Sequence, residues 1–288
     1  MKDKIYNSFR KIVLNIANEK YPSIRKRKYS FDYYLQNFVY VLSDVVHWSS
    51  LSLIHKNDKS FHWKTIYNEF NKWTKDKIFE DAFYKFIRNK YFKISQIKKH
   101  KKLKLFIDVT KIVNKLGNEG VVIHCENKKK NITPISMICD QNKLPLCISN
   151  VDINISIYNK RKTAKHEIKN VQKTLNKIDI KVKDYIDVNL IGDRGYITSE
   201  KFNVMDRRLP IITPKRRNQK NKIITDKEKL LLLERYKIEN VFALVNKNNR
   251  VMVRRDKNIN NYFSFMYMAM LEIHISFAFN KNLEKYVK

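Results

Sequence analysis

The feature of this chain that most limits its fold is a change of hydrophobic pattern at residue 103. Before that point, apolar side chains recur three and four residues apart, which is typical of helices that bury one face. After it, the apolar runs are short and rich in β-branched residues, as in the strands of a sheet. A basic stretch over 98–102 separates the two patterns. We therefore expect a helical region over residues 1–100 and an α/β domain over residues 101–288.

The first region is predicted to contain three amphipathic helices. Their apolar patterns lie over 31–45, 63–73 and 79–87, and Ser30 precedes the first of them as a capping residue. A small helical module of this kind suits DNA binding in the helix-turn-helix manner. A helical packing region without any DNA role is the alternative. The sequence leaves both open, because no base-reading residue can be identified.

The second region reads as strand, hairpin, helix, strand, helix, strand, helix. This order resembles that of the ribonuclease H-like fold, a mixed sheet with helices on its faces. The expected strands lie at 105–107, 132–138, 144–148, 188–191 and 210–212, and the expected helices at 163–176, 226–246 and 261–279.

Three acidic residues stand out by their setting in this region. Asp108 follows the run Leu-Phe-Ile, Asp193 follows Val-Asn-Leu-Ile-Gly, and Glu239 lies in a helical stretch. Side chains at the carboxyl ends of strands meet at one edge of such a sheet. Mg²⁺ prefers hard oxygen ligands of this kind, and three carboxylates suffice for a pair of ions. Taken singly, each acid also fits a plain reading as a turn residue or a surface ion-pair partner.

Arg235 lies one helical turn before Glu239 and on the same face of the expected helix. We expect it to hold that carboxylate or to contact a phosphate. Ile238, Val241 and Val245 form the apolar stripe of the same helix and should face the sheet. Glu239 lies beside this stripe, within reach of the sheet edge.

The charge of the chain points to a phosphate-bearing partner. Sixty Lys and Arg residues stand against 28 Asp and Glu, for a formal net charge of +32. Basic clusters at 160–162, 207–208 and 215–217 flank the second and third acids and suit a DNA groove, although each also fits an ordinary solvated loop. An RNA or membrane-surface role would follow from charge alone but would explain none of the carboxylates.

The cysteines and the apolar runs indicate an intracellular protein. Cys125, Cys139 and Cys147 form no C-x-x-C pair, so buried reduced thiols are expected in place of a disulfide framework or a zinc site. We expect no apolar run near twenty residues and no signal peptide, and the sequence does not distinguish cytoplasm from nucleus.

Several of these segments together resemble the DDE transposases of the bacterial insertion-sequence type. Residues 105–110 resemble the segment with the family's first aspartate. Residues 190–196, Leu-Ile-Gly-Asp-Arg-Gly-Tyr, resemble that of the second aspartate and are the most specific match. Residues 235–242 resemble the glutamate helix. The resemblance spans roughly residues 45 to 275, and its other segments are 64–73, 132–146 and Arg254-Arg255-Asp256.

The resemblance implies a function and assigns residues to it. Asp108, Asp193 and Glu239 would bind two Mg²⁺ ions, for which Mn²⁺ can substitute. The enzyme would cleave double-stranded DNA at the ends of a mobile element and join those ends to target DNA. It would act as a homo-oligomer on DNA, with no membrane partner. The residues assigned to DNA contacts are Arg235, Lys215, Arg216, Arg217, Arg254 and Arg255.

Two positions depart from the family pattern. The family often has a tyrosine three residues before the arginine and a lysine seven after the glutamate, where this chain has Leu232 and Asn246. His166-Glu167 resembles a His-Asp pair of some relatives, with either an auxiliary role or none. Two alternatives stay open: a nuclease of the same fold without strand transfer, and a non-catalytic DNA-binding descendant of a transposase.

Overall fold

The computed structural model shows a chain that folds into two compact units. The helical unit comprises Met1–Lys90, Lys115–Glu119 and Val245–Lys288, and the sheet unit comprises Tyr91–Asn114 and Gly120–Leu244. This division differs from the expected boundary at residue 100, because the C-terminal helix packs with the N-terminal helices. The structure describes residues 2–22, 28–43, 47–95, 102–123, 131–155, 162–164, 168–180, 187–204, 207–215 and 223–287.

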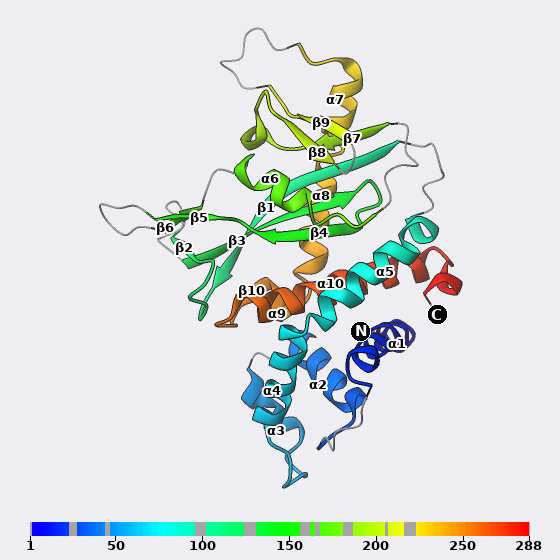
Figure 1. Cartoon of the computed structure of the whole chain (residues 1–288), viewed down its shortest axis with the longest axis vertical. Helices are drawn as coiled ribbons and strands as arrows, with labels where there is room; N and C mark the ends of the chain where they lie inside the picture. Colours follow the sequence, from blue (N-terminus) through cyan, green and yellow to red (C-terminus); the bar gives the residue numbers. More distant parts are fainter. Residues whose placement is uncertain are drawn as a thin grey trace. The chain divides into compact units, whose positions relative to one another are not determined.

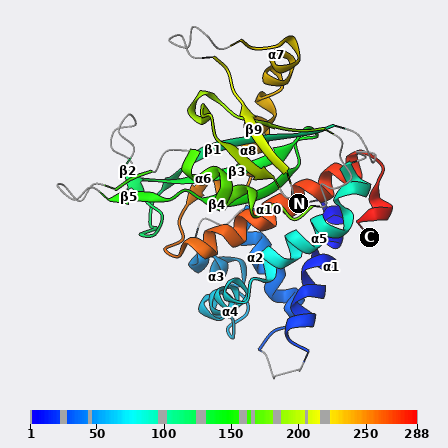
Figure 2. The same cartoon turned by 45° about the horizontal axis from the view of Figure 1, so that its top comes forward.

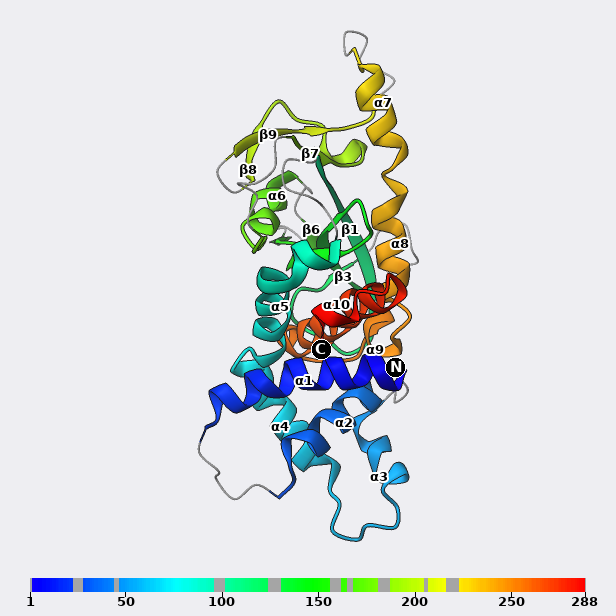
Figure 3. The same cartoon turned by 90° about the vertical axis from the view of Figure 1, so that its right-hand side faces the viewer.

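The helical unit is built around its last helix, α10 (Ile259–Asn280), which contacts α1, α4 and α9 (Figure 3). The three helices expected from the sequence are present as α2, α4 and α5. Ser30 caps α2 as expected, since its Oγ accepts the Tyr33 N–H at 3.2 Å. The first helix was missed, although its buried Phe9, Val13 and Ile16 follow a helical spacing. The other helices are α1 (Asp3–Lys20), α2 (Phe31–Ser43), α3 (Leu51–Ile54), α4 (Trp63–Lys75), α5 (Ile78–Ser95) and α9 (Asn249–Met252).

Helix α10 corrects the expectation that the chain has no apolar run near twenty residues. Within the described residues it is the one helix long and apolar enough to cross a membrane, yet 67% of its most apolar window is buried inside the protein. Two of its buried polar side chains have partners there: Ser264 Oγ lies 2.9 Å from Thr74 Oγ1, and Asn261 donates to Asn71 at 2.6 Å. Its Phe265 ring stacks on Phe70, with centroids 4.6 Å apart. These contacts are those of a core helix.

Arg254 is fully buried in the helical unit and serves as a clamp for backbone carbonyls. Its guanidinium donates to Asp256 O at 3.0 Å, to Lys257 O at 2.9 Å and to Glu119 O. A Cβ at Gly117 would stand 2.4 Å from Arg254 Cζ, so a larger residue at this position would displace the guanidinium. The sequence predicted a DNA contact for Arg254, whereas its burial favours an internal role.

The sheet unit contains a mixed sheet, visible in Figures 1 and 2, with the strand order β2-β3-β1-β7-β9-β8 and β4 beside β3. Strand β1 runs antiparallel to β3 and parallel to β7, which in turn runs parallel to β9. A small separate pair, β5 and β6, lies next to β2. The strands are β1 (Leu103–Asn114), β2 (Val122–Ile123), β3 (Asn131–Asp140), β4 (Pro145–Asn150), β5 (Ile153–Ile155), β6 (Lys162–Ala164), β7 (Val188–Ile191), β8 (Lys201–Val204) and β9 (Arg207–Ile212).

Helices lie on the two faces of this sheet (Figure 3). Helix α6 (Ile168–Leu175) contacts β3, β4 and β8 on one face. On the other face, α7 (Asp226–Leu233) is followed by α8 (Tyr236–Val245). Ile238 and Val241 of α8 are fully buried, as the apolar stripe predicted. The mixed α/β class expected from the sequence is therefore confirmed for this part of the chain.

The predicted hairpin is also present, as β3 and β4. Its turn is held by Asp140, whose Oδ1 accepts the N–H groups of Asn142 at 2.9 Å and Leu144 at 2.8 Å. Tyr91 donates its hydroxyl to Asp140 Oδ2 at 2.8 Å. Cys139 and Cys147 are buried free thiols, as expected, while Cys125 lies outside the described residues.

Four details of the sheet unit differ from the sequence prediction. Strand β1 is much longer than 105–107, because it continues along β3 after its pairing with β7 ends. Thr163 belongs to β6, and α6 begins only at Ile168. In the described residues between β7 and β9, a short 3₁₀ turn η3 (Arg194–Tyr196) and β8 stand where a helix was expected. The long helix expected over 226–246 is broken into α7 and α8.

We expect Arg254→Met to lower the free energy of unfolding by about 3 kcal/mol, because it removes a buried donor shared by three backbone carbonyls, including that of the buried Asp256. The neighbouring Arg255→Ala, which removes a half-buried side chain of the same charge, should change it by less than about 0.5 kcal/mol. Urea unfolding of both variants measures the difference. An equal loss of unfolding free energy in the two variants would contradict the clamping role of Arg254.

Candidate active site

The parallel register of β1 and β7 brings two of the predicted acids to the same level of the sheet. Phe106 pairs with Ile191, and Asp108 and Asp193 each lie two residues further along their segments. Strand β7 has ended at that level, while β1 continues with Asp108 opposite Met137 of β3. Asp108 thus lies within a strand and not at its end, which corrects the sequence prediction. It nevertheless lies just past the parallel pairing, where the sheet opens.

Local packing fixes the position of Asp193. The Gly192 N–H donates to Ile212 O at 3.0 Å, which continues the pairing of β7 with β9. A Cβ at Gly192 would come within 2.9 Å of Tyr196 Cδ2 and 3.1 Å of Ile211 Cγ2, so a side chain at this position would clash with both residues. Asp193 Oδ1 then accepts the Gly195 N–H at 2.6 Å and caps η3. One of the two carboxylate oxygens of Asp193 therefore stabilises the turn, as the alternative interpretation of this residue expected.

Arg235 links the first and third predicted acids. Its Nη2 donates to Glu239 Oε1 at 3.0 Å, and its Nη1 lies 3.6 Å from Asp108 Oδ2. The expected contact between Arg235 and Glu239 is thus present. The side chains become more exposed from Asp108 (17%) through Arg235 (31%) to Glu239 (57%). The arrangement forms a cluster with one cation between two carboxylates.

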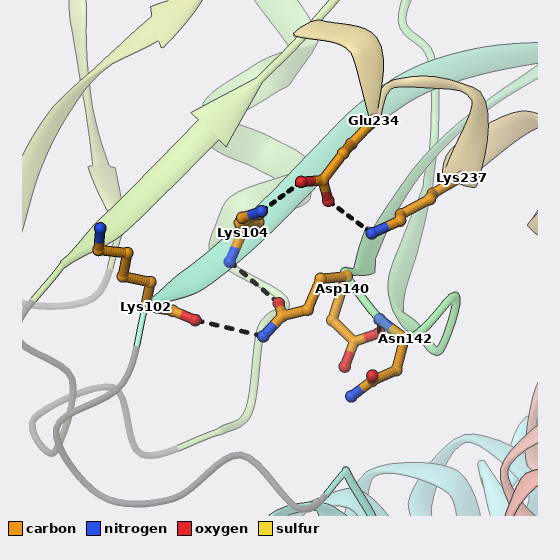
Figure 4. A network of polar contacts seen from close by, with 7 residues as sticks. Lys102, Lys104, Asp140, Asn142, Glu234 and Lys237 are labelled. Atoms are coloured by element: carbon orange, nitrogen blue, oxygen red, sulfur yellow. Dashed lines mark hydrogen bonds and ion pairs between the residues drawn. The ribbon is translucent and has the colours of Figure 1, made fainter. Parts of the chain in front are cut away.

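A second set of charges holds this cluster against β1 (Figure 4). Glu234, in the turn between α7 and α8, pairs with Lys104 of β1 and with Lys237 of α8, the latter at 2.5 Å. Burial alone would raise the pKa of Glu234, but hydrogen bonds from the two lysines outweigh it and lower the pKa. The start of β1 is held in turn by Gln141, which accepts the Lys104 N–H at 3.0 Å and donates to Lys102 O at 3.2 Å.

The acids of the cluster influence one another electrostatically. The pKa of Asp108 is raised from 3.8 to about 6, chiefly because burial disfavours the charged carboxylate. The Val109 N–H and Arg235 lower this pKa, whereas the negative charges of Asp193 and Glu239 raise it further. Asp108, Asp193, Glu239 and Arg235 therefore act as one charged site. A carboxylate with a pKa raised as that of Asp108 is typical of a functional site.

The residues of this cluster fit a divalent metal by donor chemistry. Three carboxylates supply the hard oxygen ligands and the negative charge that Mg²⁺ or Mn²⁺ needs. Among the described residues, however, no three His, Cys, Asp or Glu side chains are arranged to hold an ion as they stand. Arg235 explains part of this, because its guanidinium lies against both Asp108 and Glu239. Metal binding would require these carboxylates to close on the ion.

The other predicted site residues have the following settings. Lys215 is exposed beyond β9, and Arg255 is half-buried in the helical unit together with the buried Arg254. Sequence reasoning missed Glu234 and Lys237, although their spacing of three residues on a helical stretch is an ion-pair signal. Arg216, Arg217, the residues 98–101 and 160–161, and the His166-Glu167 pair lie outside the described residues.

Comparison with known proteins gives a family match to part of the chain. Residues 156–259 match the protein family described as transposase DDE domain. The matched segment contains Asp193, Arg235 and Glu239 and begins after Asp108. No curated protein and no solved structure matches the chain. The match confirms the resemblance to DDE transposases, which act on DNA and generally use divalent metal ions.

We expect Asp108→Asn to stabilise the metal-free protein in a pH-dependent manner. Because the folded-state pKa of Asp108 is raised from 3.8 to about 6, stability falls as pH rises through this interval and stays reduced above it. Asparagine cannot ionise, so the variant should gain about 1–3 kcal/mol at about pH 8 and nothing at about pH 4.

Unfolding in urea with a chelator present, at several pH values, measures this gain. Asp226→Asn is the matched control, since the Asp226 side chain is 93% exposed on α7. A gain for Asp108→Asn that is the same at every pH would contradict the electrostatic origin.

Proposed function

We propose that this chain, which carries a transposase DDE domain, is a metal-dependent transposase of an insertion-sequence-like element. One observation carries the proposal. Arg235 joins Asp108 to Glu239, and the register of β1 with β7 sets Asp193 beside Asp108. A charged site made from these three acids, partly inside the matched segment, is what the chemistry of the family needs.

The fold supports the same proposal. The order of β1, the β3–β4 hairpin, α6, β7, β9 and the final helices follows the order expected for a ribonuclease H-like domain. The departure is the stretch between β7 and β9, where η3 and β8 stand in place of a helix. We assign the sheet unit to that fold on this basis.

In the proposed enzyme, Asp108, Asp193 and Glu239 would hold two Mg²⁺ ions, with Mn²⁺ as a substitute. When bound, such ions supply an activated oxygen nucleophile and neutralise charge on the phosphate. The chain itself positions the ligands. Gly192 brings Asp193 close to the sheet, the Val109 N–H orients the Asp108 carboxylate, and Glu234 holds α8 in place.

The proposed reaction has two steps. Attack of water on a phosphodiester at the element's end forms a P–O bond to the water oxygen and breaks the P–O bond to the 3′ oxygen. The products are a 5′-phosphate and a 3′-hydroxyl, whose proton comes from the water. That hydroxyl then attacks a phosphodiester of the target DNA, so that one P–O bond forms as another breaks. The net charge of +32 favours binding of both DNA segments, with Lys215, Arg216, Arg217 and Arg255 as proposed phosphate contacts. We also propose that more than one copy of the chain assembles on the DNA.

We expect alanine at Asp108, Asp193 or Glu239 to reduce metal-dependent DNA cleavage by a factor of about 10³ or more, because each change removes a ligand. Nicking and cutting of a labelled element-end duplex measures cleavage, and a gel-shift assay measures DNA binding, which should change little. Glu200→Ala, at an exposed carboxylate of the same unit, is the matched control and should cut normally. Normal cleavage by any of the three variants would remove that residue from the site.

A joining assay separates a transposase from a nuclease of the same fold. A pre-cut element end with a free 3′-hydroxyl is incubated with plasmid DNA and Mg²⁺. Joined products are expected from the wild type and not from Asp193→Ala. Cleavage without joining would favour the nuclease, and neither activity would favour a DNA-binding descendant.

A further inference from the structure

The contacts of Arg235 place a fixed positive charge where the proposed ligands meet. Its two terminal nitrogens are shared between Asp108 Oδ2, at 3.6 Å, and Glu239 Oε1, at 3.0 Å. A guanidinium stays charged at all physiological pH values, and its planar shape suits two carboxylates at once. Arg235 therefore neutralises part of the charge that a bound metal would otherwise neutralise.

We propose that Arg235 is a displaceable counter-cation: it holds Asp108 and Glu239 in the metal-free protein and leaves them when a divalent metal binds. The inference rests on the proposed function, because it concerns the same three acids. It assigns to Arg235 a regulatory role that precedes any contact with DNA. Metal affinity would then be set by competition between an internal and an external cation.

Competition follows from the chemistry of the ligands. A divalent ion needs the carboxylate oxygens that now face Arg235, and two cations on the same oxygens repel one another. The opposite role, in which Arg235 preorganises the acids for the metal, would require it to stay in place while the ion binds.

The surroundings of Arg235 allow it to leave without disturbing the helix. Its side chain is 31% exposed, so the guanidinium has access to solvent. Helix α8 is fixed separately by Glu234, which pairs with Lys104 and Lys237, and by the buried Ile238. Glu239 can therefore keep its place on α8 after Arg235 has moved.

Calorimetric titration of the full chain with Mn²⁺, in the absence of DNA, tests the proposal. The Mn²⁺ binding that remains in Asp193→Asn measures binding outside the proposed site. Arg235→Gln should bind Mn²⁺ about fivefold to tenfold more tightly than the wild type, because a partly exposed ion pair no longer has to be broken. Arg208→Gln, which removes an exposed charge on β9, should bind as the wild type does. Arg235→Lys, whose point charge cannot bridge both acids, should bind Mn²⁺ with an affinity between those of the wild type and Arg235→Gln.

Thermal unfolding supplies a second readout on the same proteins. With a chelator, Arg235→Gln should unfold at a lower temperature than the wild type, and saturating Mn²⁺ should remove the difference. Equal or weaker Mn²⁺ binding by Arg235→Gln overturns the counter-cation while the proposed function stands. If Asp193→Asn removes no Mn²⁺ binding from the wild type, both the counter-cation and the proposed metal site are overturned.

Discussion

The parallel pairing of β1 with β7 is the constraint on which the rest of the sheet unit depends. It buries the apolar runs of both strands, and its register carries Asp108 and Asp193 to the same level. Because β7 stops there while β1 continues along β3, the two acids lie where the sheet opens. A shift of the register by one residue would exchange the faces of every side chain on β7 and separate the pair. The same hydrogen bonds thus build the core and locate the site.

The electrostatics of the unit divide its acids into two kinds. Glu234 is neutralised by two lysines and anchors α8 to β1, so it serves the structure. Asp108 and Glu239 instead share Arg235, and the pKa of Asp108 stays raised to about 6. Holding a carboxylate ionised under these conditions costs stability, which the buried contacts of the surrounding sheet must offset. A carboxylate in this state, as Asp108 is, is more consistent with binding than with stabilisation.

Much of this could be predicted from the sequence, because the signals were local. Apolar runs predicted the strands and the hairpin, and the setting of Asp108, Asp193 and Glu239 pointed to a shared site. What could not be predicted depends on distant partners. The length of β1 is set by its pairing with β3, and Glu234, at the break between α7 and α8, pairs with the distant Lys104. Arg254 looked like a surface cation, since arginine is seldom buried, yet carbonyls such as Glu119 O enclose it.

The strong positive charge of the chain makes the sharing of one arginine by Asp108 and Glu239 informative. The chain has 60 Lys and Arg residues against 28 Asp and Glu, so basic side chains are abundant enough to pair with each carboxylate separately. Glu234, for example, pairs with two lysines. Asp108 and Glu239 share one, and that one is partly exposed and lies in a turn. Complete neutralisation by fixed lysines would exclude a divalent ion, and no neutralisation would separate the acids by repulsion. A single shared arginine satisfies both requirements, because it keeps the acids together while leaving them available to a stronger cation.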